Sequence, residues 1–201
     1  MAHPETGDVQ ANRARRSRLL RCIAIMVLVA IIVVLGVVVL VIWLVIRPSQ
    51  IVYTVEDGSI GGFDLRGNTL NATFKLSLGA YNPNRRVAIY YDLIDVDVWF
   101  EEQMIAFGDV PPFFQPHRNV AHLAVKALAQ SMPLRGYVSS DLRHQRSSGY
   151  IKLEVLMKAR IHFKVGVWKS MHYNLRVSCP SVVLHFRSSN GFHRTNCGVH
   201  L

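Results

Sequence analysis

Polar and apolar residues alternate along most of the chain after residue 68. The clearest run is 151–165, IKLEVLMKARIHFKV, in which every second residue from Ile151 to Val165 is apolar and most of the others are charged. A strand with one buried and one wet face gives this pattern, whereas a helix would scatter the same residues around its circumference. At about 3.3 Å per residue the run would reach roughly 50 Å, so we expect it to bend or bulge.

Shorter stretches repeat the alternation between turn signals. Residues 93–100 alternate up to a Glu-Glu-Gln turn, and residues 119–128 favour a strand although their composition also suits a helix. Residues 139–149 suit a short helix. About seven strands separated by turns are typical of an antiparallel sandwich. We therefore expect an all-β sandwich domain with one short helix over residues 69–201.

A different pattern occupies residues 22–46, where no side chain is charged. Roughly 20 apolar residues are enough to cross a bilayer as a helix. The run is too long for a cleaved signal peptide and lacks a small-residue cleavage site. A buried core helix is the alternative, but a chain of this size cannot surround so long an apolar rod. We expect one retained transmembrane helix.

The flanks of this span set its direction. Five arginines precede it and only Arg47 follows closely, and cytoplasmic flanks hold the excess of Lys and Arg. The basic tail, residues 1–21, should therefore be cytosolic. Residues 47–68 contain four glycines and are expected to form a connector to the outer domain.

The charge divides between the two sides of the membrane. Of the net charge of +10, the tail carries five arginines against Glu5 and Asp8, which is +3, so that +7 remains on the outer part. The polar face of the 151–165 strand is a candidate contact face for an acidic cell-wall polymer or anionic lipid, and the alternative is a merely solvated face. Nucleic acid is not expected, because the topology keeps it away from this face. The basic residues of the face are Lys152, Lys158, Arg160 and Lys164.

The cysteines and one sequon follow the same division. Cys22 lies at the cytoplasmic edge of the span and is a palmitoylation candidate, with an unmodified thiol as the alternative. Cys179 and Cys197 lie in the outer part, where a disulfide between them is the preferred interpretation. Asn71, in Asn-Ala-Thr, is a glycosylation candidate, with an unused sequon as the alternative.

Patterns of metal and catalytic sites are weak in this chain. A C-terminal group of cysteines and histidines superficially suggests zinc, but its spacing fits no zinc finger. The carboxylates near residues 92–102 are explained by alternation along a strand, and no catalytic motif such as Gly-x-Ser-x-Gly occurs. We expect no catalytic residues, metal or cofactor, and no enzymatic activity. The C-terminal group consists of Cys179, His185, His193, Cys197 and His200.

The stretch AYNPNRR, residues 80–86, interrupts the alternation. Pro83 lacks an amide donor and suits the end of a strand. Asn82 and Asn84 are expected to satisfy local backbone groups in a turn, with a solvent-facing contact loop as the alternative.

Taken in order, these features resemble the plant non-race-specific-disease-resistance/harpin-induced-like family, whose outer part is a late embryogenesis abundant group 2 domain. The resemblance implies a seven-stranded sandwich of fibronectin III or immunoglobulin type, extracellular and anchored at the plasma membrane by the single span. It also implies a role in plant defence, the hypersensitive response and stress signalling through an unidentified protein partner, without catalytic residues. The alternative is a membrane-to-cell-wall adhesion protein that binds acidic wall polymer. The residues that carry the resemblance, besides the span, are Asn82-Pro83-Asn84, Gln115 after Pro111-Pro112, the long strand up to Gly166, and Cys179 with Cys197.

Overall fold

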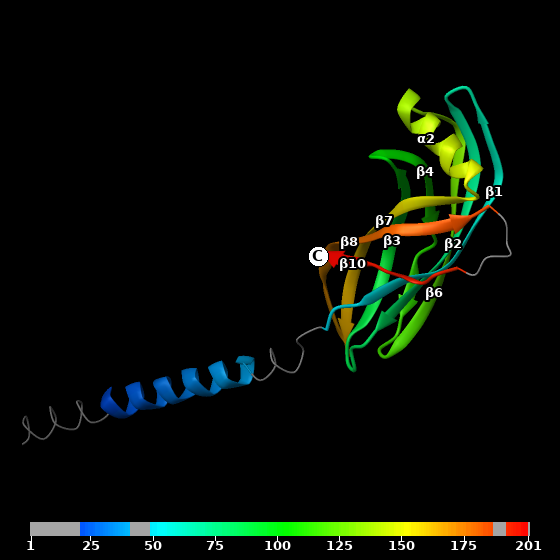
Figure 1. The fold of residues 1–201 in the computed structure, drawn as a ribbon. Helices are drawn as coiled ribbons and strands as arrows, with labels where there is room; N and C mark the ends of the chain where they lie inside the picture. The colour runs from blue at the N-terminus through cyan, green and yellow to red at the C-terminus, as the bar shows by residue number, and fades with distance from the viewer. Residues whose placement is uncertain (1–20, 41–48, 187–191, 201) are drawn as a thin grey trace, which may run out of the picture. The chain divides into compact units, whose positions relative to one another are not determined.

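The structure of the chain is a computed structural model that describes residues 21–40, 49–186 and 192–200. It has two units, Met1–Arg47 and Pro48–Leu201. The first contains a helix, Arg21–Leu40, whose side chains are exposed along its whole length (Figure 1). This helix is long and apolar enough to cross a membrane. Residues 41–46 of the expected span, and the tail up to residue 20, lie outside the described residues.

The second unit consists of antiparallel strands and one short helix, so the predicted fold class is confirmed. Within its described residues, seven strands are eight residues or longer and three are short. The helix α2 is Gly136–Ser147. The strands are β1 (Val52–Arg66), β2 (Thr69–Asn82), β3 (Ala88–Phe100), β4 (Gln103–Val110), β5 (Phe113–Gln115), β6 (Asn119–Pro133), β7 (Tyr150–Val165), β8 (Trp168–His185), β9 (Thr195–Asn196) and β10 (Gly198–His200).

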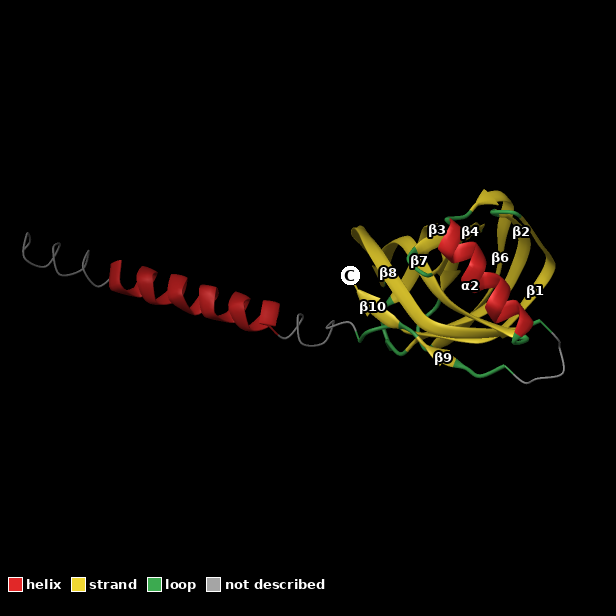
Figure 2. Cartoon of the chain, turned by 45° about the horizontal axis from the view of Figure 1, so that its top comes forward, coloured by secondary structure: helices red, strands yellow, loops and turns green. Residues whose placement is uncertain are grey.

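All the strands join one curved sheet, in the order β10-β8-β7-β3-β4-β6-β2-β1-β9 with β5 beside β3 (Figures 1 and 2). Its two ends are held by consecutive pieces of the C-terminal segment, because β9 pairs with β1 and β10 pairs with β8. The ends also face each other directly. A Cβ atom on Gly58 of β1 would overlap the Leu184 side chain of β8, so a larger residue here would require that side chain to move. The sheet therefore wraps around a single core.

The core is built from the apolar positions of the alternating strands. On β7 every second residue from Ile151 to Ile161 is buried, as the sequence predicts, while Lys152, Lys158 and Arg160 are exposed. The pairing of β7 with β8 shifts register between Leu153 and Val155 and again between His162 and Lys164. At both places the extra residue belongs to β8, so these bulges lie in the partner strand and not in the long strand itself.

The predicted connector, residues 47–68, is wrong as a structural description. Most of it is strand β1, which pairs with β2 along nearly its whole length. Tyr53 and Val55 are fully buried in the core. The glycines in the second half of β1 hide the alternation of polar and apolar residues that would identify it as a strand. The pairing shifts register between Gly61 and Asp64, so these glycines interrupt a strand and do not replace it.

Helix α2 connects β6 to β7 and contributes Val138 and Leu142 to the core. The Ser139 hydroxyl donates to the side chain of Asn68, at 2.8 Å, and Leu134 N–H donates to the Asn68 carbonyl, at 2.7 Å. Asn68 lies in the turn between β1 and β2, so the helix is fixed to that turn as well as to the core.

Candidate functional site

Two buried asparagines hold together the end of the sandwich at which β1 begins. The Asn82 amide group donates to the carbonyls of Val87, at 2.9 Å, and Pro116, at 3.1 Å. Its oxygen accepts from the backbone and side chain of Asn84. Asn84 in turn exchanges two hydrogen bonds with the backbone of Ser49, at 2.7 and 2.9 Å. The Asn-Pro-Asn landmark is therefore a buried clamp between three segments, and the solvent-facing loop considered above is wrong for both asparagines.

A second polar group crosses the core beside this clamp. Gln115 has no exposed surface, and its amide group donates to the carbonyls of Ala80, at 2.7 Å, and Asn119, at 3.0 Å. The Tyr91 hydroxyl donates to Gln115 Oε1 at 3.1 Å and lies 2.6 Å from the Tyr53 hydroxyl. Since Tyr91 has one hydroxyl hydrogen, Tyr53 is the donor in the second bond.

Burial changes the acidity of both phenols. It raises the pKa of Tyr91 from 10.0 to about 12, although the hydrogen bond from Tyr53 acts in the opposite direction. It also raises the pKa of Tyr53 well above 10.0, with further contributions from the charge and the hydrogen bond of Tyr91. Both hydroxyls stay protonated near neutral pH, so this chain of groups is structural and not an acid–base pair.

The basic residues of β7 do not form one patch. Lys158 Nζ lies 2.9 Å from Asp97 Oδ2, so an ion pair occupies the middle of the strand. Lys152 lines a shallow hollow that also contains Glu101, Glu102 and Glu154. Lys158 is also paired with exposed Arg176 of β8, and Lys164, at the far end of the strand, lies among other cations. The sequence listing of charges along one strand misses the carboxylates that neighbouring strands contribute.

Positive charge gathers in a hollow of about 390 Å³ at the end of β7. Arg85 and Arg86, which follow the asparagine clamp, are exposed there. The wall also contains apolar surface from Phe114 and Val165. Its remaining polar side chains are His117 and Lys164. This combination suits an acidic ligand that also has an apolar face.

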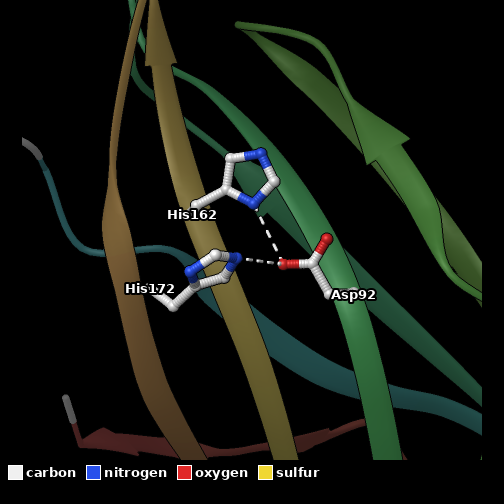
Figure 3. A group of neighbouring side chains, drawn as sticks. All are labelled: Asp92, His162 and His172. Atoms are coloured by element: carbon white, nitrogen blue, oxygen red, sulfur yellow. Dashed lines mark hydrogen bonds and ion pairs between the residues drawn. The ribbon is translucent and has the colours of Figure 1, made fainter.

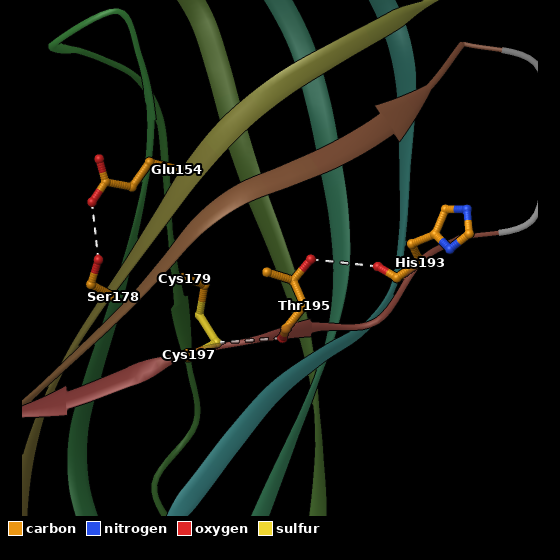
Figure 4. Close-up of a disulfide and its surroundings, with 6 residues drawn as sticks. All are labelled: Glu154, Ser178, Cys179, His193, Thr195 and Cys197. Atoms are coloured by element: carbon orange, nitrogen blue, oxygen red, sulfur yellow. Dashed lines mark hydrogen bonds between the residues drawn. A yellow bond between two sulfur atoms is a disulfide. The ribbon is translucent and has the colours of Figure 1, made fainter.

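Cys179 and Cys197 form a disulfide, with a sulfur–sulfur distance of 2.04 Å (Figure 4). Cys179 lies in β8 and Cys197 lies between β9 and β10, so the bond fixes the segment that closes the sheet. The Cys197 N–H also donates to the Tyr53 carbonyl at 3.0 Å. A zinc site that uses both thiolates is incompatible with this bond.

The two modification candidates differ in their surroundings. Cys22 is exposed near the start of the apolar helix. Asn71 is exposed on β2, and its Oδ1 accepts the N–H of Ser131 at 2.8 Å. Ser131 has a φ of 48° at a bulge of β6, so Asn71 supports that bulge. Palmitoylation and glycosylation remain predictions.

One polar cluster has no counterpart among the sites expected from the sequence. Asp92 Oδ2 lies 3.0 Å from His162 Nδ1 and 3.4 Å from His172 Nε2 (Figure 3). The three residues come from β3, β7 and β8, which are adjacent in the sheet. Two imidazoles and one carboxylate are a donor set that transition metals accept. Their spacing along the chain gives no sign of a common site.

The chain is similar in sequence to known plant proteins. Residues 77–179, from β2 to β8, match the family model described as late embryogenesis abundant protein. NDR1/HIN1-like proteins 10 and 3 of Arabidopsis thaliana are each 31% identical to the chain, over 155 and 166 residues. The matches cover 76% and 80% of this chain, and 68% and 72% of those relatives. An uncharacterized Arabidopsis thaliana protein is 29% identical over 191 residues, which are 93% of this chain and 86% of that protein.

The matched region contains the structural features that carry the family resemblance. The asparagine clamp, the buried Gln115 and the long strand β7 all lie within residues 77–179. Relatives at this level of identity extend the match over most of the chain. The chain therefore belongs to the late embryogenesis abundant family and, within it, to the NDR1/HIN1-like proteins, a plant family related to stress and defence.

Proposed function

We propose that the chain is a non-enzymatic single-pass plasma-membrane protein whose β-sandwich lies outside the cell and acts in plant defence, the hypersensitive response and stress signalling through protein contacts. The observation that carries the proposal is the helix Arg21–Leu40, which is uncharged after Arg21 and has no buried side chain. So much exposed apolar surface suits lipid and would be unfavourable in water. Membership of a stress- and defence-related family supports the biological role.

Two features support the outward direction. The arginines before the helix favour a cytosolic N-terminus. The Cys179–Cys197 disulfide suits an oxidising compartment, as outside the cell or in the secretory lumen.

A role in binding partners suits the division of polar side chains into buried ones that hold the fold together and exposed ones at the surface. Asn82, Gln115 and Tyr91 are buried and occupied by one another or by the backbone. At the same end of the sandwich, Arg85 and Arg86 are exposed and can contact a partner. The rigid sandwich thereby holds an exposed basic surface for partners.

Labelling by a proximity enzyme tests the topology. An enzyme fused after Leu201 should label cell-surface and secretory proteins, and the same enzyme fused before Met1 should label cytosolic proteins. The reverse distribution would overturn the orientation, and cytosolic labelling from both ends would overturn the membrane span.

Adhesion to acidic cell-wall polymer is a second candidate, favoured by the basic hollow around Arg85, Arg86 and Lys164. The full chain in detergent should bind polygalacturonate more tightly than its methyl-esterified form, and binding should weaken with salt. Reversal of these three charges to Glu should remove the binding. Lys152→Glu is the matched control, because Lys152 already lies among carboxylates. Equal binding by the triple variant would exclude adhesion through this hollow and leave protein contacts as the function.

A further inference from the structure

We propose that Asp92, His162 and His172 form a binding site for a divalent transition-metal ion such as Zn²⁺. The proposal rests on their geometry and is independent of the membrane topology and of the partner proposed above. His162 and His172 are directly paired across β7 and β8, and Asp92 lies on β3, the other neighbour of β7. Three adjacent strands thus each offer one ligand to the same point (Figure 3).

The distances suit a small metal ion. All three ligand atoms lie within 4.8 Å of one another. Ligands bound to zinc at about 2.0 to 2.2 Å in a tetrahedron are about 3.4 Å apart. The carboxylate oxygen already lies at 3.0 and 3.4 Å from the two nitrogens. Small side-chain rotations would complete the site, with the metal replacing the hydrogen now shared between Asp92 and His162.

Two strand bulges bring the ligands together. Tyr91 pairs with Ile161 and Leu93 with Arg160, so Asp92 is an extra residue in β3. Between the pairs Lys164–Lys169 and His162–His172, β8 has one residue more than β7. Without this second bulge, His162 would lie opposite Met171, and His172 would face the other side of the sheet. Bulges often re-aim side chains at functional sites.

Neighbouring contacts hold the ligands in place. The His162 ring stacks on Tyr90, with ring centres 4.8 Å apart and planes 8° apart. The Ser170 hydroxyl accepts the Phe163 N–H at 2.9 Å, which satisfies a backbone donor at the second bulge. The His162 side chain is 12% exposed and that of His172 50% exposed, so one ligand is fixed while the site stays open to solvent.

The donor set selects the kind of ion. Lys164 and Lys169 lie with their ammonium groups 6.0 and 5.3 Å from the centre of the Tyr90 ring, beside the cluster. The cluster offers a single carboxylate, so a hard ion such as Ca²⁺, which needs several oxygen ligands, is disfavoured. An ion held by imidazole nitrogens is favoured, and its open position suits water or an anion.

Direct titration of Zn²⁺ into the full chain tests the proposal. The chain should be held in detergent and purified without a histidine tag. We expect one ion per chain with competition from Cu²⁺ and none from Ca²⁺ or Mg²⁺. His172→Gln, His162→Gln and Asp92→Asn should each weaken binding by about tenfold or more. Since His172 is half exposed, its variant should fold normally.

His122→Gln is the matched control. It removes a histidine–carboxylate pair of the same kind, His122 with Glu56 at 2.8 Å, to which the described part of the chain adds no third ligand. This variant should bind Zn²⁺ as the wild type does. Co²⁺ gives an independent signal, because ligation by nitrogen and oxygen should produce visible absorption that His172→Gln abolishes. No measurable binding by the wild type, or equal affinities of the wild type and His172→Gln, would overturn the site.

Discussion

At the scale of single residues, the hydroxyl of Tyr91 holds the polar centre of the core together. It donates to Gln115 and accepts from Tyr53, and neither partner has another side-chain hydrogen bond at the atoms involved among the described residues. Gln115 in turn fixes the backbone at Ala80 and Asn119. The loss of one hydroxyl therefore has different consequences at the two tyrosines.

Tyr91→Phe should destabilise the sandwich more than Tyr53→Phe. The first change leaves Gln115 Oε1 and the Tyr53 hydroxyl buried without partners, at about 1 to 3 kcal/mol each. The second removes one donor from an oxygen that keeps its other bond, at about 1 kcal/mol. Chemical denaturation of the two variants measures the difference. Equal losses of unfolding free energy would show that the groups are not coupled in this way.

The same phenols predict a loss of stability at alkaline pH. The pKa of Tyr91 is raised from 10.0 to about 12 in the folded state, so the folded chain binds its proton more tightly than the unfolded chain. This contribution is fully present below pH 10 and is lost as pH rises toward 12. This difference in pKa between the folded and unfolded chain corresponds to about 3 kcal/mol of unfolding free energy.

Denaturation at a series of pH values tests this effect, with tyrosinate absorbance as a second signal. The wild type should lose stability steeply between pH 10 and 12. Tyr91→Phe should start less stable and show a shallower slope over the same interval. A wild-type profile that stays flat over this interval would contradict the assignment.

Single residues were predictable from sequence where their partners are local. The exposure of Arg85 and Arg86 and the turn at Pro83 follow from neighbouring residues. The burial of Asn82 and Asn84 could not be predicted in this way, because their partners include Pro116 and Ser49, which are 34 and 35 positions away in the sequence. The long-range partners turn a local turn motif into a buried clamp.

At the scale of elements, the C-terminal segment is the piece that closes the sheet. Its strands are only Thr195–Asn196 and Gly198–His200, so their few backbone hydrogen bonds hold β1 and β8 weakly. The disulfide at Cys197 compensates for this shortness by fixing the segment between the two strands it pairs with.

Loss of the disulfide should therefore weaken the closure. Cys179→Ala with Cys197→Ala should lose about 3 kcal/mol of unfolding free energy for a closed loop of this length, and a similar loss should follow reduction of the wild type. Hydrogen exchange should rise at Gly198–His200 and at Arg176–Ser178, with which they pair. Cys22→Ala is the control and should leave the sandwich unchanged. If the double variant matched this control, the segment would be held by other contacts.

Elements with regular alternation were predictable, and irregular pairing was not. Period two identified β3, β6 and β7, because each has one buried face. It missed β1, whose glycines and register shifts hide the buried positions Tyr53 and Val55. No sequence pattern indicates the bulge in β8. The pairing of His162 with His172 could therefore not be predicted from the β7–β8 hairpin.

At the scale of the whole molecule, the two units have separate physical tasks. The described helix has no buried side chain, whereas the core of the second unit draws on residues from Ile51 onward. Ser49, held by Asn84, is the earliest described residue with a side-chain partner in the sandwich. The unit that begins at Pro48 therefore contains everything that its described core requires.

Two truncated chains test whether the sandwich domain begins at Pro48, as in the structure, or at residue 69, as the sequence suggests. A chain of residues 48–201 should stay in aqueous solution without detergent and unfold at the same temperature as the sandwich of the full chain. A chain of residues 69–201 should fail to fold cooperatively, because it lacks β1 with Tyr53 and Val55 and leaves β2 as an open edge. Near-ultraviolet circular dichroism and thermal denaturation compare the two. Cooperative unfolding of the shorter chain at an unchanged temperature would mean that β1 is dispensable and that residues 49–68 act as a connector after all.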